Sequence, residues 1–158
     1  MSVPAEAARL YLLHARYAAG TGQFGLARGW LKNAGTLAAR SKDRWLCSQA
    51  LRRLAQVQAQ IGEFREARAL AKKALAQAVG ENQEALAHLA RAHVDVLEDE
   101  IEAALAAIEA ALAVLKKTSD PRAGVLAYAE LLRARIWRST GLPERALLAV
   151  QRALHLAR

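Results

Sequence analysis

Apolar residues recur along this chain at intervals of three and four positions, within segments of about 15 to 20 residues. Such spacing lays the apolar side chains along one face of an α-helix. No stretch alternates apolar and polar residues, as a half-buried strand would. Groups of turn-forming residues separate the segments at 20–22, 41–43, 62, 80–82, 97–100, 118–121 and 141–143. The pattern therefore predicts an all-α chain of eight helices.

Two prolines predict where the seventh and eighth helices begin. Pro121 follows Ser119 and Asp120, which are both suited to cap the first turn of a helix. Pro143 is followed by Glu144, and proline and an acidic residue both suit a first turn. We expect helix starts near 120 and at 143.

Small residues repeat at fixed positions in every second helix. Pairs of alanines seven residues apart occur at 27 and 34, 67 and 74, 104 and 111, and 146 and 153, at repeat spacings of 40, 37 and 42 residues. The preceding helices supply Ala15, Ala55, Ala134, and Ala90 or Ala92. Small side chains let two antiparallel helices approach closely. The repeat predicts four helical hairpins at about 3–41, 42–79, 82–117 and 120–158, stacked within one domain, 1–158.

The turn and second helix of these hairpins resemble the tetratricopeptide repeat superfamily. The resemblance rests on Gly22-Gln23-Phe24 followed by Ala27, and on Gly62-Glu63-Phe64 followed by Ala67. Units near 40 residues resemble the degenerate repeats of MalT-like bacterial transcriptional regulators. The resemblance implies an α-solenoid with a right-handed superhelical stack, whose first helices form a concave face that binds a peptide or protein segment. The third hairpin departs from the pattern because its turn has no glycine.

Charge is distributed unevenly, although the net value is +8 and the isoelectric point is about 10.2. Residues 1–80 hold 13 Lys and Arg against 4 Asp and Glu, a balance of +9. Residues 81–115 carry −7, and residues 116–158 carry +6. A banded field of this kind can steer an acidic partner. The simpler interpretation is that these charges keep the helix surfaces solvated.

The sequence contains no motif that indicates a catalytic, cofactor or metal site. Residues 20–25 match G-x-G-x-x-G, but a dinucleotide site needs a strand before this motif, and an alanine-rich helix is predicted there. His88 and His93 are spaced to point apart on a helix, and the single cysteine, Cys47, can form no internal disulfide. We expect no enzymatic activity, no metal and no cofactor. The absence of a secretory signal and of a long apolar stretch favours a cytoplasmic protein.

A polar ladder on the first helices is the predicted ligand-binding face. Its predicted members are Arg9, Leu12, Arg16, Gln49, Arg52, Gln56, Glu84, Ala87, Arg91, Tyr128, Leu131, Arg135 and Arg138. Guanidinium groups pair well with carboxylates, which favours an acidic peptide or chain terminus. Alternatives are a ligand-sensing domain of a transcriptional regulator, or nucleic-acid binding through basic patches. The acidic middle band argues against nucleic acid. Arginines that only solvate an empty groove would also give this pattern.

The last helix predicts an oligomer. Leu147 and Leu154 follow the repeat alanines by one residue, where they would cover a next hairpin that the chain does not supply. Leucines left exposed at the end of a repeat array lose the stabilising free energy that burial would give them. We therefore expect this edge to be covered by another chain or by residues outside this sequence, and we expect a homodimer through the C-terminal hairpin.

Overall fold

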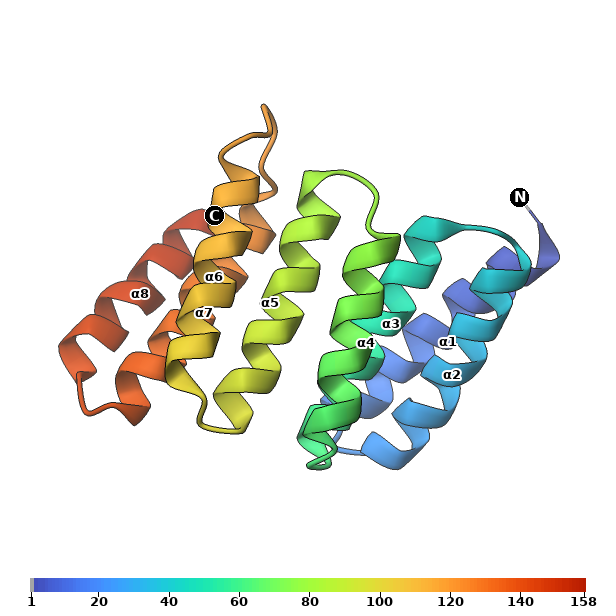
Figure 1. The fold of residues 1–158 in the computed structure, drawn as a ribbon, viewed down its shortest axis with the longest axis horizontal. Coiled ribbons are helices and arrows are strands. Elements are labelled where there is room, and N and C mark those ends of the chain that lie inside the picture. The colour runs from blue at the N-terminus through green and yellow to red at the C-terminus, as the bar shows by residue number, and fades with distance from the viewer. Residues whose placement is uncertain (1) are drawn as a thin grey trace. The chain divides into compact units, whose positions relative to one another are not determined.

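The computed structural model describes residues 2–158, and in that range the chain folds into eight α-helices without a strand (Figure 1). The helices are α1 (Val3–Gly20), α2 (Phe24–Arg40), α3 (Arg44–Gln60), α4 (Phe64–Gln77), α5 (Glu81–Leu97), α6 (Ile101–Leu115), α7 (Ala123–Ser139) and α8 (Pro143–Leu156). Consecutive helices pair as four antiparallel hairpins, α1–α2, α3–α4, α5–α6 and α7–α8. The prediction of an all-α chain of helical hairpins is confirmed.

All four hairpins use one turn geometry. The middle residue of each three-residue turn has a positive φ, at Gly22 (77°), Gly62 (86°), Asp99 (64°) and Gly141 (76°). The following N–H then donates to a carbonyl five residues earlier, as from Glu63 to Gln58 at 2.9 Å. This is the Schellman type of helix ending, which favours glycine. The third hairpin keeps the turn without glycine because aspartate tolerates the left-handed region better than most residues do.

The repeated alanines lie in the hairpin contacts. The three pairs in α2, α4 and α6 are each 0% exposed, and the pair in α8, Ala146 and Ala153, is 9% and 4% exposed. Ser48 in α3 shows how close two helices come, because its hydroxyl donates to the Ala74 carbonyl of α4 at 2.9 Å. The small residues therefore permit the close approach that the repeat predicted.

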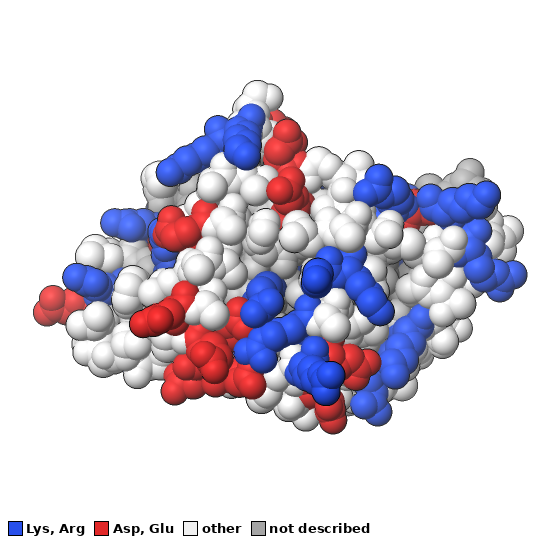
Figure 2. Space-filling model, viewed as in Figure 1, with Lys and Arg blue, Asp and Glu red and all other residues white. Residues whose placement is uncertain are grey.

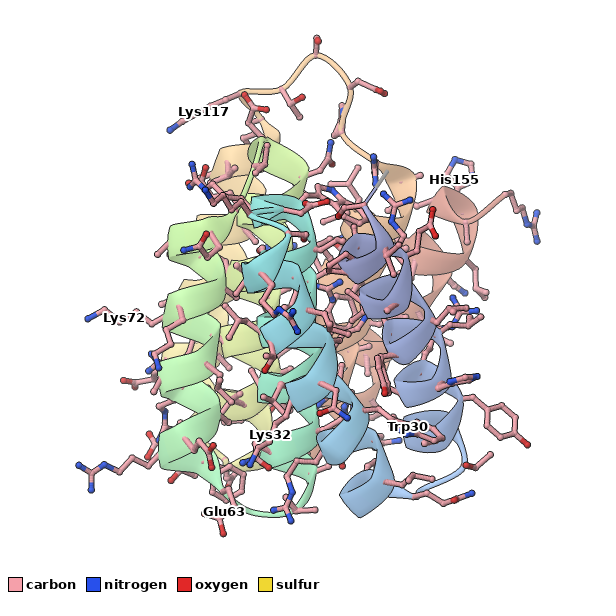
Figure 3. The ribbon with its side chains drawn as sticks, turned by 90° about the vertical axis from the view of Figure 1, so that its right-hand side faces the viewer. Trp30, Lys32, Glu63, Lys72, Lys117 and His155 are labelled. Atoms are coloured by element: carbon pink, nitrogen blue, oxygen red, sulfur yellow. The ribbon has the colours of Figure 1, made fainter. Side chains whose placement is uncertain are left out.

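The chain divides into two compact units, of which the first, the N-terminal unit, ends at Val79. Its two hairpins are joined by the three-residue turn 41–43, in which Lys42 has a φ of 55° and Asp43 caps α3 by accepting from the Leu46 N–H at 3.0 Å. α3 packs against its hairpin partner α4 and, across this turn, mainly against α2 rather than α1. Trp30 lies between α1 and α2, with its ring 5.2 Å from that of His14 (Figure 3).

The second compact unit, the C-terminal unit, begins at Gly80, and a longer segment, 116–122, joins its hairpins. α7 begins at Ala123, so the predicted start near 120 is wrong. The Asn82 side chain instead bridges this segment to α5, accepting from the Arg122 N–H at 2.9 Å and donating to the Asp120 carbonyl at 3.1 Å. The predicted start of α8 at Pro143 is confirmed. Besides its hairpin partner α8, α7 packs against both α5 and α6. The superhelical stack of all four hairpins stays a prediction.

Candidate functional site

A cavity of about 390 Å³ in the C-terminal unit contains four residues of the predicted ligand-binding face. Tyr128, Arg135 and Arg138 line it from α7, together with Leu131. Their spacing along α7 places them on one helix face, as predicted. The rest of the lining comes from α5, α7 and α8: His93, Leu132, Ala134, Ala146 and Val150. We call this cavity the α7 pocket.

His93 forms part of the pocket wall and is neutral at pH 7. The residue is 9% exposed, and the Tyr128 hydroxyl lies 3.3 Å from His93 Nδ1. Burial, followed by the nearby charge of Arg135, lowers the pKa of His93 to about 4. Both causes disfavour the imidazolium. The pocket therefore combines a neutral imidazole and a phenol with an apolar floor.

Two arginines make one side of the pocket positive. Among the described residues, neither Arg135 nor Arg138 forms an ion pair with a carboxylate. Arg91 behaves differently, because its Nε donates to both carboxylate oxygens of Asp95, at 2.9 and 3.1 Å. Asp95 is 1% exposed, so this pair holds Arg91 against α5. The structure thus brings together Tyr128, Arg135 and Arg138, while Arg91 is engaged within its own helix.

The N-terminal unit holds a second cationic feature, the arginine pair Arg16 and Arg53. Arg53 lies on α3 and is half-buried, and its Nε is buried without a hydrogen-bond partner among the described residues. Burial and the charge of Arg16 on α1 lower the pKa of the Arg53 guanidinium. Arginine nevertheless stays charged at neutral pH. Two like charges near each other favour a bound anion.

The remaining predicted residues are spread over both units. Arg9 is exposed, and Gln49, Arg52 and Gln56 are half-buried along α3. Leu12 and Ala87 do not line an open face, because they are 6% and 2% exposed within the helical core. Hydrophobic burial takes these two positions into the packing between helices.

Sequence reasoning missed His93 and Arg53 as members of these features. In the sequence, His93 stands out only beside His88, as a candidate metal ligand. Its position across from Tyr128 depends on the packing of α5 against α7. Arg53 differs from Arg52 by one position, and only the placement of α3 decides that Arg53 is the one whose guanidinium senses the charge of Arg16. The sequence does hold one signal for Arg53. It is a basic residue at the repeat position where α7 has the apolar Leu132.

A further cavity of about 560 Å³ lies among α6, α7 and α8. Arg133 bridges Glu109 and Glu130 at this site, and the Arg145 guanidinium lies 5.4 Å from the centre of the Trp137 ring. Trp137 therefore lies beside an arginine at this site. Because two carboxylates neutralise part of the charge, this cavity is less suited to an anion than the α7 pocket is.

Other predicted features are clarified by the same structure. The motif 20–25 runs from the end of α1 into α2, with Gly22 at the hairpin turn, so it lacks the strand that a dinucleotide site needs. Among residues 2–158, no three side chains of the metal-ligating types come together. None of the described helices combines the length and apolar character that crossing a membrane requires.

Comparison with known proteins gives no assignment. No protein-family model matches this chain, and no curated protein is similar enough to it to count as a relative.

Proposed function

We propose that this chain is a non-enzymatic binding module that holds a short acidic segment of a partner protein in the α7 pocket. The observation that carries the proposal is the combination of an apolar floor with Arg135 and Arg138 on one side of a 390 Å³ cavity. An apolar side chain of a peptide fits the floor. A neighbouring carboxylate fits the guanidinium groups, which recognise it through paired N–H donors.

The neutral state of His93 supports an acidic ligand with a further polar contact. With its pKa near 4, the imidazole adds no positive charge at pH 7. The Tyr128 hydroxyl, 3.3 Å from His93 Nδ1, adds a polar group to the same pocket wall. The same peptide-binding role is what the resemblance to tetratricopeptide repeats implies.

Phage display of random heptapeptides on the immobilised chain tests the proposal. We expect enriched peptides to contain acidic residues next to an apolar one. Each lost charge-assisted hydrogen bond removes about 1.5–3 kcal/mol. Arg135→Ala combined with Arg138→Ala should therefore weaken a selected peptide at least tenfold, as measured by fluorescence polarisation.

The control is Arg122→Ala, which removes an exposed arginine of the same unit from outside the pocket. It should leave peptide affinity unchanged. Equal weakening by the control, with a steep dependence on salt, would instead indicate nonspecific binding of polyanions, including nucleic acid. Failure to enrich any peptide that depends on Arg135 and Arg138 would overturn the proposal.

A further inference from the structure

α1 exposes an apolar face to solvent. Leu10, Leu13 and Tyr17 are 59%, 54% and 72% exposed, and their spacing of three and four residues places them on one side of the helix. We call this face the α1 edge. Large apolar side chains gathered in this way on a surface are typical of an interaction site.

The repeat register identifies the residues of α7 that are equivalent to the α1 edge. Aligning Ala15 of α1 with Ala134 of α7 matches the three residues of the α1 edge with Ala129, Leu132 and Ile136. These three residues of α7 are 0%, 1% and 0% exposed, within the core of the C-terminal unit. The α1 edge thus has the composition of a face that the preceding hairpin covers.

α8 exposes the matching side of the same contact. Leu147 and Leu154 are both 59% exposed, and we call this pair the α8 edge. The equivalent residues of α6 are Leu105 and Leu112, at the same positions relative to the repeat alanines. Both are partly buried and pack against the cluster that contains the equivalent face of α7. In the N-terminal unit, a Cβ added at Gly35 of α2, the position equivalent to Leu154, would lie 4.0 Å from the Ala50 Cβ of α3.

We propose that the α8 edge of one copy of this chain packs on the α1 edge of a second copy. The contact would repeat, between chains, the contact that α6 makes with α7 within the C-terminal unit. Within each unit, the second helix of one hairpin packs on the first helix of the next, α2 on α3 and α6 on α7, and the first helices α1 and α5 add contacts to α3 and α7. A head-to-tail contact reproduces this pairing, whereas a symmetric contact of α8 with α8 does not. Head-to-tail contacts between identical chains produce rings or open arrays.

The charges around the two edges predict an unusual salt dependence. The N-terminal unit carries 13 Lys and Arg against 4 Asp and Glu, and Arg145, Arg152 and Arg158 lie on or beside α8. Two positive surfaces repel each other, and salt screens the repulsion. Raising sodium chloride from about 50 to about 500 mM should therefore strengthen the association, whereas binding of a polyanion would weaken.

Two edge variants test the arrangement by sedimentation velocity. One variant carries Leu10→Glu with Leu13→Glu, and the other carries Leu147→Glu with Leu154→Glu. Since all four side chains are more than half exposed, the variants should keep the parent's circular dichroism. We expect each variant alone to be a monomer. An equimolar mixture should form a dimer and stop there, because only one intact pair of edges remains. The parent should form larger species as concentration rises.

Each other outcome overturns the proposal. A parent chain that stays monomeric at high concentration and high salt excludes it. Dimerisation of the α1-edge variant alone indicates a symmetric α8 contact, and dimerisation of the α8-edge variant alone indicates a symmetric α1 contact. The control is Leu26→Glu, at an exposed leucine whose repeat equivalent, Glu66, is also exposed. It should assemble as the parent does.

Discussion

The two units repeat the same hairpin but differ in how their hairpins are joined and charged. A three-residue turn joins the hairpins of the N-terminal unit, and α3 packs on α2 far more than on α1. Seven residues join those of the C-terminal unit, where α7 contacts both α5 and α6 and leaves the 560 Å³ cavity beside α6. The hairpin contact therefore depends on the repeated alanines, while the contact between hairpins depends on the connecting segment.

Charge separates the two units further. The N-terminal unit has a balance of +9, whereas residues 80–158 hold 10 Lys and Arg against 11 Asp and Glu, a balance of −1. On the visible face, Lys and Arg predominate over the N-terminal unit, and Asp and Glu gather around the turn between α5 and α6 (Figure 2). The nearly neutral unit nevertheless contains the α7 pocket, because packing places its arginines and carboxylates at different sites.

The largest expected difference between the units is in acid. His93 has its pKa lowered to about 4 in the C-terminal unit, so the unfolded chain binds a proton that the folded unit does not as pH falls from about 6.5 to about 4. The C-terminal unit should lose roughly 3 kcal/mol of stability over this range, with no further loss from His93 below it.

Tryptophan fluorescence can follow this loss in one unit. Trp30→Phe with Trp45→Phe leaves Trp137 as the reporter of the C-terminal unit in denaturant titrations. His93→Gln in that background should remove most of the slope between pH 4 and 6.5. An unchanged slope would mean that His93 is protonated in the folded unit.

A smaller effect is expected where the units differ at one repeat position. Arg53 of α3 corresponds to Leu132 of α7, which is 1% exposed. Replacing a buried charge that lacks a partner with an apolar residue of similar length is often stabilising. Arg53→Leu should stabilise the N-terminal unit by about 1–2 kcal/mol, as measured by Trp30 and Trp45 fluorescence in a Trp137→Phe background.

The same variant also tests the arginine pair as an anion site. Sulfate should stabilise the parent more than Arg53→Leu, because a bound anion relieves the repulsion between Arg16 and Arg53. Arg65→Leu, at an exposed position, is the control and should keep the parent's response to sulfate. A loss of stability in Arg53→Leu would show that its guanidinium has a stabilising partner in solution.

The smallest expected effects concern the turns. Asp99, in the turn between α5 and α6, has a φ of 64°, where the other three hairpin turns have glycine, and Lys42, in the turn that joins α2 to α3, has a φ of 55°. Asp99→Gly and Lys42→Gly should each stabilise the chain by about 0.5–1 kcal/mol. This gain is the left-handed backbone strain that glycine relieves, minus the larger conformational entropy that glycine loses on folding. Thermal unfolding measures the gain. The reverse change, Gly62→Ala, should destabilise, and a stabilising result there would contradict the turn geometry.

Much of the fold could be predicted from the sequence because helices and hairpins depend on local patterns. Apolar spacing located the helices, and alanine pairs located the close contacts that the structure buries at positions such as Ala67 and Ala74. The predicted start of α7 was wrong because capping residues compete with distant partners, here the Asn82 side chain. The sequence placed Tyr128, Arg135 and Arg138 together on one face of α7, but it did not place His93 of α5 beside them.

The sequence by itself determined the all-α class, the number of helices and the residues that share a helix face, since each depends on contacts between near neighbours in the chain. Only the tertiary structure decided that His93 meets Tyr128 in the α7 pocket, that the half-buried Arg53 lies near the charge of Arg16, and that Asp95 holds Arg91 from a buried position. These outcomes depend on the rotation and offset of one helix against another. A shift of one residue turns a helix by about 100°, which exchanges a buried side chain for an exposed one.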